Sequence, residues 1–118
     1  MSTPYIQNIV DSNVTINAGY YKSFMFVVPT GVSTATVQGT FTVSNGRDIK
    51  VYITNGTNLS DWQNGLNSNM YFSGNGSAGN VTTSVPPNWT YYLVYDNTYS
   101  TISKNITTNV DYFYVPID

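Results

Sequence analysis

The sequence predicts an all-β fold, a single antiparallel β-sandwich of the jelly-roll type with about eight strands. Three observations predict it: apolar and polar residues alternate, turn signals recur at short spacing, and only one short segment suits a helix. Alternation is strictest over residues 34–44, where Ala35, Val37, Gly39, Phe41 and Val43 share one face. Gly39 inside this strand predicts a bend or bulge.

The other strands follow from shorter alternating runs. Residues 1–12 are predicted to be an N-terminal strand or arm, set off from the next strand by Asp11 and Ser12. Residues 20–28 are nearly all apolar or aromatic, which predicts a central strand buried on both sides. The remaining strands are predicted around Val14, Ile16 and Ala18; Ile49, Val51 and Ile53; Tyr91, Leu93 and Tyr95; and Ile106, Val110, Tyr112 and Tyr114.

Turn residues separate these runs and predict where the chain reverses. Asn-Gly pairs begin at Asn45, Asn55 and Asn75, and such pairs favour tight hairpins because both residues accept positive φ angles. The helix candidate covers residues 58–65, with Ser60 as the cap of a single turn that carries Trp62. We expect residues 1–118 to form one domain without a linker.

Charge is scarce in this chain. Charged residues make up 8% of it, whereas soluble domains carry about 25%. Four cations and a net charge of −2 argue against nucleic acid and against docking on anionic membranes. No apolar run is long enough to span a membrane, and the N-terminus does not resemble a signal peptide.

Catalytic equipment is also scarce. The chain has no histidine and no cysteine, so no Ser-His-Asp or Cys-His arrangement can form, and we expect no enzymatic activity, cofactor or metal site. Two alternatives stay open: a glycosidase-like pair formed by Asp61 and Asp96, and calcium held by Asp48 or Asp96. Scattered aspartates in a β-domain are more often turn residues and solvated charges.

Asn-X-Ser/Thr triplets are frequent. They exceed the roughly four that the Asn, Ser and Thr content would produce by chance. The possible N-glycosylation sites are Asn13, Asn55, Asn58, Asn75, Asn80, Asn88 and Asn105. The alternative is that a chain rich in Asn and Thr contains such triplets without their being modified.

Aromatic residues make up 15% of the chain and include eleven tyrosines. Trp62, Tyr71 and Trp89 lie in or near predicted loops, where they are candidates for contact with a sugar or with another subunit. Most of the tyrosines are expected to cover the edges of the core.

Five stretches of the chain carry a resemblance to known domains. They are residues 13–21, the corner at 28–32, the strands at 36–43 and 48–53, and the run at 90–97. Together they resemble the small jelly-roll domains of the GOLD (emp24-like) and bacterial pre-peptidase C-terminal types, from about Asn13 to Tyr114. Asn88 and Trp89 stand where those domains often have glycine before the following strand. The resemblance implies a non-catalytic module for attachment, packing or partner contact.

These observations favour a structural or assembly subunit on an exterior surface. It would be a virion protein (capsid, turret or spike) of an archaeal-type virus, or an extracellular filament subunit, packing against copies of itself or other structural proteins. Ile6, Ile9 and Val10 are candidate anchors of a strand added to a neighbouring subunit, unless they belong to the first strand of their own sheet. The alternative function is a carbohydrate-binding or adhesion module at the cell surface.

Overall fold

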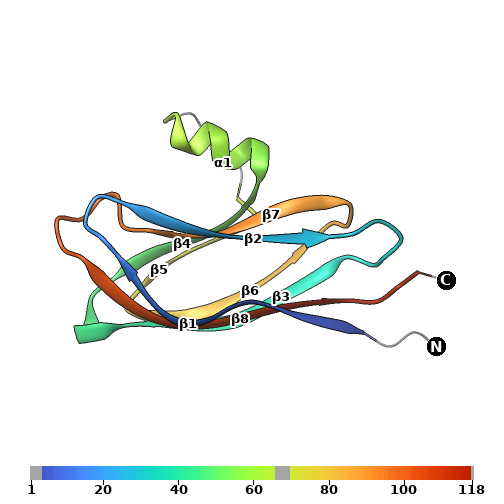
Figure 1. Cartoon of the computed structure of the whole chain (residues 1–118), viewed down its shortest axis with the longest axis horizontal. Helices are drawn as coiled ribbons and strands as arrows, with labels where there is room; N and C mark the ends of the chain where they lie inside the picture. Colours follow the sequence, from blue (N-terminus) through green and yellow to red (C-terminus); the bar gives the residue numbers. More distant parts are fainter. Residues whose placement is uncertain (1–3, 66–69, 118) are drawn as a thin grey trace.

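The alternating apolar residues form eight strands that turn their apolar sides toward the space between two antiparallel sheets (Figure 1). The computed structural model describes residues 4–65 and 70–117. Its strands are β1 (Tyr5–Ile16), β2 (Tyr21–Val28), β3 (Ala35–Val43), β4 (Ile49–Asn55), β5 (Phe72–Gly76), β6 (Ala78–Val85), β7 (Trp89–Asp96) and β8 (Lys104–Tyr114). The predicted all-β sandwich of eight strands is confirmed.

Strand order shows the jelly-roll character of the fold. One sheet has the order β1-β8-β3-β6 and the other has β2-β7-β4-β5, so the chain crosses between the sheets at most of its turns. Among the described residues, β4 and β5 are the one pair of strands that is both consecutive and hydrogen-bonded, and a helix lies between them. The tight hairpins predicted from the Asn-Gly pairs are therefore wrong, because a turn residue reverses the chain without deciding which strands pair.

The N-terminal segment is part of a long edge strand. β1 runs from Tyr5 to Ile16 and pairs with β8 along its length, with one irregularity between Asn8 and Val10. The predicted separation at Asp11 and Ser12 is therefore wrong. Their polar side chains face solvent, and backbone pairing continues through them.

The prediction of a central, fully buried strand at residues 20–28 is also wrong. β2 lies at the edge of its sheet, with β7 on one side and no described strand on the other. Its side chains alternate between the two faces of the sheet. Phe26 and Val28 point into the core, whereas Met25 and Val27 are exposed. An apolar composition does not reveal whether a strand is buried on both sides, because the face of a sheet that points away from the core can carry exposed apolar residues.

Gly39 has a different role from the predicted bulge. The registers of β3 with β6 and with β8 continue unbroken through this residue. A Cβ at Gly39 would lie 2.2 Å from the carbonyl oxygen of Asn109 and 2.5 Å from the Cα of Val110. The glycine therefore allows β8 to approach β3 closely in the middle of the sheet.

The helix has the predicted length but begins two residues earlier. α1 spans Gly56–Gln63, and the side chain of Asn55 caps it by accepting a hydrogen bond from the backbone N–H of Asn58 at 2.9 Å. Ser60 lies inside the helix and is not its cap, so that prediction is wrong. No helix among the residues described is long and apolar enough to cross a membrane.

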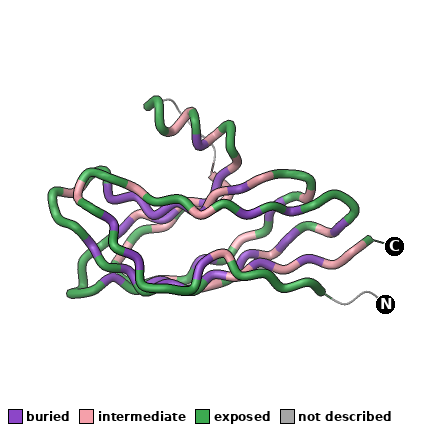
Figure 2. The backbone as a smooth tube through the Cα atoms, viewed as in Figure 1, coloured by how far each residue is buried: buried purple, intermediate pink, exposed green. Residues whose placement is uncertain are grey.

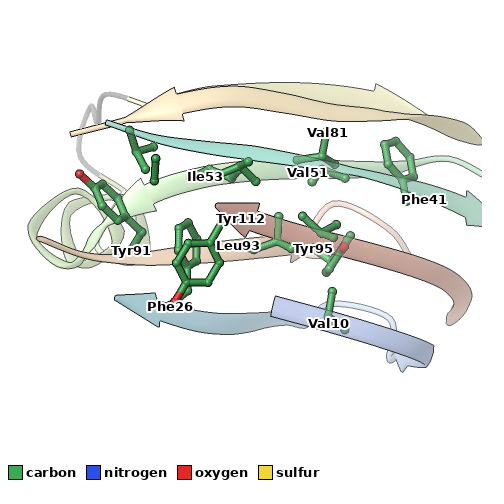
Figure 3. Close-up of a cluster of buried hydrophobic side chains, with 14 of the residues drawn as sticks. Val10, Phe26, Phe41, Val51, Ile53, Val81, Tyr91, Leu93, Tyr95 and Tyr112 are labelled. Atoms are coloured by element: carbon green, nitrogen blue, oxygen red, sulfur yellow. The ribbon is translucent and has the colours of Figure 1, made fainter. Parts of the chain in front are cut away.

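The core fills the space between the sheets along the whole length of the strands (Figure 2). Phe26 joins the two sheets, because its ring stacks on Tyr91 of its own sheet and contacts Tyr112 of the other (Figure 3). Tyr95 is fully buried, and its hydroxyl shares a 2.5 Å hydrogen bond with Thr108, which donates to the carbonyl of Thr40. The buried polar atoms of this pair therefore have partners.

Candidate functional site

α1 lies over the outward face of the sheet β2-β7-β4-β5 (Figure 1), and a small second cluster of side chains forms between the helix and that face. Leu59 of the helix and Val94 of β7 are buried although they lie outside the main core. Trp62 packs edge-on against Tyr21 at 5.0 Å between ring centroids and lies 6.0 Å from Tyr52. These contacts hold the helix on the sheet and leave the neighbouring part of the face open.

An apolar patch occupies that open part, beside the N-terminal end of α1. It consists of Met25 and Val27 on the outward side of β2, together with Trp89 at the start of β7, opposite the core residue Val28; their exposed fractions are 63%, 47% and 53%. Val27 and Trp89 line a groove of about 440 Å³. The other lining residues are Val28, Pro29, Gly56, Thr57, Asn88 and Thr90. None of the residues of the patch or the groove is charged.

The three aromatic residues singled out in the sequence lie in three different contacts. Trp62 is half-buried against tyrosines under the helix, and Tyr71 packs edge-on against Tyr91 at 5.3 Å. Trp89 is the most exposed of the three and belongs to the apolar patch. The patch residues Met25 and Val27 were missed because they sit in a segment that the sequence predicts to be buried.

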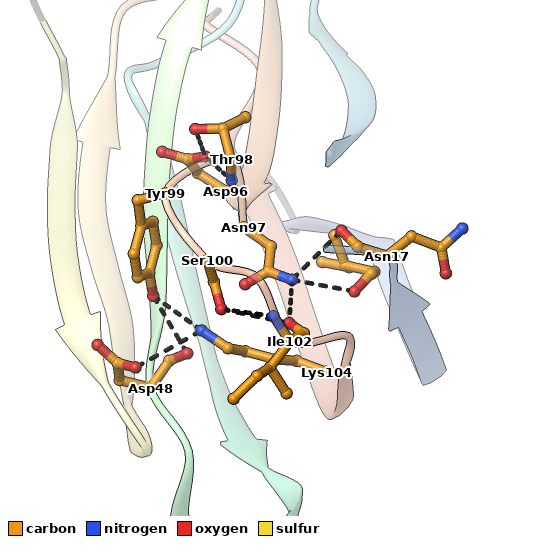
Figure 4. A network of polar contacts seen from close by, with 10 residues as sticks. Asn17, Asp48, Asp96, Asn97, Thr98, Tyr99, Ser100, Ile102 and Lys104 are labelled. Atoms are coloured by element: carbon orange, nitrogen blue, oxygen red, sulfur yellow. Dashed lines mark hydrogen bonds and ion pairs between the residues drawn. The ribbon is translucent and has the colours of Figure 1, made fainter. Parts of the chain in front are cut away.

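Charged residues gather at the far end of the strands, around Tyr99 (Figure 4). Lys104 is only 4% exposed, and its Nζ lies 3.5 Å from the carboxylate of Asp48 and 3.2 Å from the Tyr99 hydroxyl. Lys50 and Lys104 both lie over the Tyr99 ring, at 4.7 and 4.6 Å. Loss of hydration around the hydroxyl, with Asp48 as a second cause, raises the pKa of Tyr99 to about 12.

This cluster is best understood as structural. Each of its groups already has a partner of opposite charge, a ring or a hydrogen bond within the chain. Next to it, Asn97 is fully buried and donates through Nδ2 to the carbonyls of Ile16, Asn17 and Ile102. It thereby joins the turn after β7 to the end of β1. Neither Lys104 nor Asn97 carries a sequence signal for these roles.

The aspartates named as possible catalytic or calcium-binding groups have local roles. Asp96 is buried and accepts hydrogen bonds from the backbone N–H and the hydroxyl of Thr98 at 2.8 and 2.6 Å. Asp61 lies on α1, and Asp48 pairs with Lys104. Within residues 4–65 and 70–117, no three acidic side chains gather as a metal site would require.

The glycosylation candidates differ in their surroundings. Asn13, Asn75, Asn80, Asn88 and Asn105 are exposed, whereas Asn55 and Asn58 are half-buried at the start of the helix. Two of the triplets lie opposite each other on β1 and β8. The Thr15 hydroxyl donates to Oδ1 of Asn105 at 2.8 Å, and the Thr107 hydroxyl donates to Oδ1 of Asn13 at 2.7 Å.

The candidate inter-subunit anchors belong to β1. Val10 is buried in the core of its own chain, Ile9 packs partly against that core, and Ile6 is 72% exposed. On its other side β1 has no neighbouring strand in the described structure, because it lies at the edge of its sheet.

Fold and surface together define this chain as a small jelly-roll β-sandwich domain. No protein-family model and no curated protein sequence matches it, so the more specific resemblance to GOLD and pre-peptidase C-terminal domains stays a prediction.

Several solved structures have a similar fold. A structure of Bacillus endospore appendages, which form disulfide-linked pili, aligns with a TM-score of 0.55 and 6% identity over 100% of this chain and 92% of that one. The Yersinia pseudotuberculosis-derived mitogen aligns with a TM-score of 0.51 and 7% identity over 100% and 88%. A carbohydrate-binding module of a xylanase from the hindgut metagenome of Trinervitermes trinervoides aligns with a TM-score of 0.49 and 11% identity over 98% of both chains. Identities this low show a shared fold alone.

Proposed function

We propose that this chain is a non-enzymatic structural subunit that self-associates on an exterior surface, as part of an extracellular filament or of the capsid, turret or spike of a virion. The observation that carries this proposal is the apolar patch formed by Met25, Val27 and Trp89. Three large apolar side chains adjoining an uncharged groove are typical of a surface that a partner covers.

The scarcity of charge supports contact between copies. Contact between apolar groups is favourable, whereas burying an unpaired charge is costly. The patch and its groove contain no charged residue, so covering them removes no ion from water. The fold shared with the endospore appendage structure, whose subunits form pili, supports a filament in particular.

The test is the association state of the purified chain. We expect light scattering to show oligomers at high concentration, and a Met25→Ser, Val27→Ser variant to need a higher concentration to form them. Tyr20→Ser is the matched control, because Tyr20 is a large exposed side chain outside the patch. A wild-type chain that stays monomeric at millimolar concentration would refute self-association.

A second candidate function is carbohydrate binding in the groove beside Trp89. An exposed indole next to Asn88, Thr57 and Thr90 combines a stacking surface with hydrogen-bonding groups, as a sugar requires. This candidate predicts a change in tryptophan fluorescence on adding a polysaccharide that is lost in Trp89→Ala and kept in Trp62→Ala. No response to a broad panel of polysaccharides would dismiss it.

A further inference from the structure

We propose that copies of this chain stack edge to edge, so that β6 of one copy pairs with β1 of the next and both sheets continue from subunit to subunit. This inference rests on the proposed function of self-association and names the surfaces that perform it.

The first observation is that the sheet β1-β8-β3-β6 ends on both sides in strands that lack lysine, arginine and proline. Natural edge strands are blunted by lysine, proline, bulges or shortness. β6 has eight residues and no charge, and β1 has twelve residues with Asp11 as its single charge. Neither contains lysine, arginine or proline. The irregularity at Asn8 in β1 leaves residues 10–16 regular, which nearly matches β6 in length.

The second observation is the direction of the strands. Every neighbouring pair in both sheets is antiparallel, and each sheet has four strands. The two outer strands of a sheet therefore run in opposite directions. When a second copy is placed beside the first in the same orientation, β6 meets the next β1 antiparallel, and β5 meets the next β2 antiparallel. The hydrogen-bonding pattern can continue without turning the copy over.

The third observation is that the two edges needed for such a contact lie on the same side. β1 lies next to β2 on one side of the sandwich, and β6 lies next to β5 on the other. One copy thus offers β6 and β5 together to the β1 and β2 of its neighbour. This contact joins two different surfaces, so it does not close on itself and extends into a filament.

The geometry specifies a repeat. The chain measures 50 × 29 × 16 Å. Its shortest dimension runs from one edge strand of a sheet to the other, and Figure 1 views the molecule along this direction. Four strands at about 4.8 Å each give an axial rise of about 19 Å per subunit. The strands lie across the filament axis, and the exposed Met25 and Val27 of β2 come to lie beside the junction with the next copy.

The experiment compares hydrogen exchange in the dilute and the assembled wild-type chain. We expect the amides of residues 10–16 and 78–85 to gain protection together on assembly, because those edges pair only between copies. Electron microscopy of the same sample should show filaments with the rise of about 19 Å.

A pair of matched variants tests the edge itself. Thr82→Asp with Ser84→Asp adds two carboxylates to β6, and Thr40→Asp with Thr42→Asp adds two to the same face of the central strand β3, all at exposed positions. The edge variant should need about tenfold more protein to assemble than the β3 variant, since like charges across paired strands are destabilising and Asp11 lies on the opposing edge. Thermal melting of both monomers checks that each variant folds.

The outcomes separate the two proposals. Assembly that both variants retain equally, with no protection gained at residues 10–16 and 78–85, overturns edge stacking and leaves self-association standing. A wild-type chain that never assembles overturns both.

Discussion

Replacing Gly39 with alanine should destabilise the fold by about 3 kcal/mol, because the added methyl group has nowhere to go. The Cβ of the alanine would lie 2.2 Å from the carbonyl oxygen of Asn109 and 2.8 Å from a methyl group of Val110. Both distances are shorter than 3.0 Å, which Cβ atoms in proteins essentially never approach more closely. Two of the three clashing atoms belong to the backbone of β8, so no side-chain rotation relieves them. The central strands β3 and β8 must separate, which places the cost at the upper end of the range for overpacking.

The measurement is urea unfolding followed by tryptophan fluorescence. A loss of about 3 kcal/mol moves the midpoint of a domain of this size down by roughly 1.5 M, with little change in the slope. Gly79→Ala is the matched control on β6, since its Cβ would meet only the ring of Phe41, at 3.0–3.1 Å, and that ring can shift. Equal midpoints for the Gly39 variant and the wild type would refute the close approach of β8 and β3.

Three other predictions concern pH, the helix and modification. Burial raises the pKa of Tyr95 from 10.0 to about 12, so the folded chain keeps a proton that the unfolded chain loses. The stability that this proton linkage provides is therefore fully present below pH 10 and is lost between pH 10 and 12, by about 3 kcal/mol. In urea unfolding, the Tyr95→Phe variant should lose less free energy of unfolding over that pH range than the wild type. Equal losses in the two proteins would contradict the assignment to Tyr95. Asn55→Ala removes the helix cap and should cost about 1 kcal/mol, seen as faster hydrogen exchange in α1, whereas Asn55→Asp should retain the protection. In protein from its native source, peptide mapping should find glycans on Asn13 or Asn105, which are exposed and whose side-chain oxygens accept hydrogen bonds from threonine hydroxyls; a glycan on Asn55 alone would contradict this.

The strands themselves were predictable because alternation reports directly which face of a strand is buried. Residues 34–44 contain β3, and Ala35, Val37, Phe41 and Val43 are all buried as the pattern predicts. The partner of each strand was not predictable. Crossing between sheets and forming a hairpin both need a chain reversal, and Asn45 with its positive φ serves a crossing here.

The patch was missed for a related reason. A run such as Phe24 to Val28 has the composition of a strand buried on both sides, but Met25 and Val27 are exposed because they point to the face of β2 that lies away from the core. The buried Lys104 was missed because its partners come from distant parts of the sequence. Asp48 lies between β3 and β4, and Tyr99 lies between β7 and β8, so the ion pair exists only once the sheets have packed.

The placement of the charges bears on how the surface is used. All four cations lie at one end of the sandwich. The strands β2, β4 and β8 begin at this end, and the connection between β3 and β4 lies there as well. Asp48 and Asp96 lie at the same end. Lys104 is buried and Lys50 lies over a tyrosine ring, so these two cations serve the internal packing of that end. Lysine is the residue that most often keeps sheet edges apart, and this chain places none on β1 or β6. A chain with so few charges that leaves both edge strands of the sheet β1-β8-β3-β6 free of cations has, on that sheet, the edges required for pairing with its own copies.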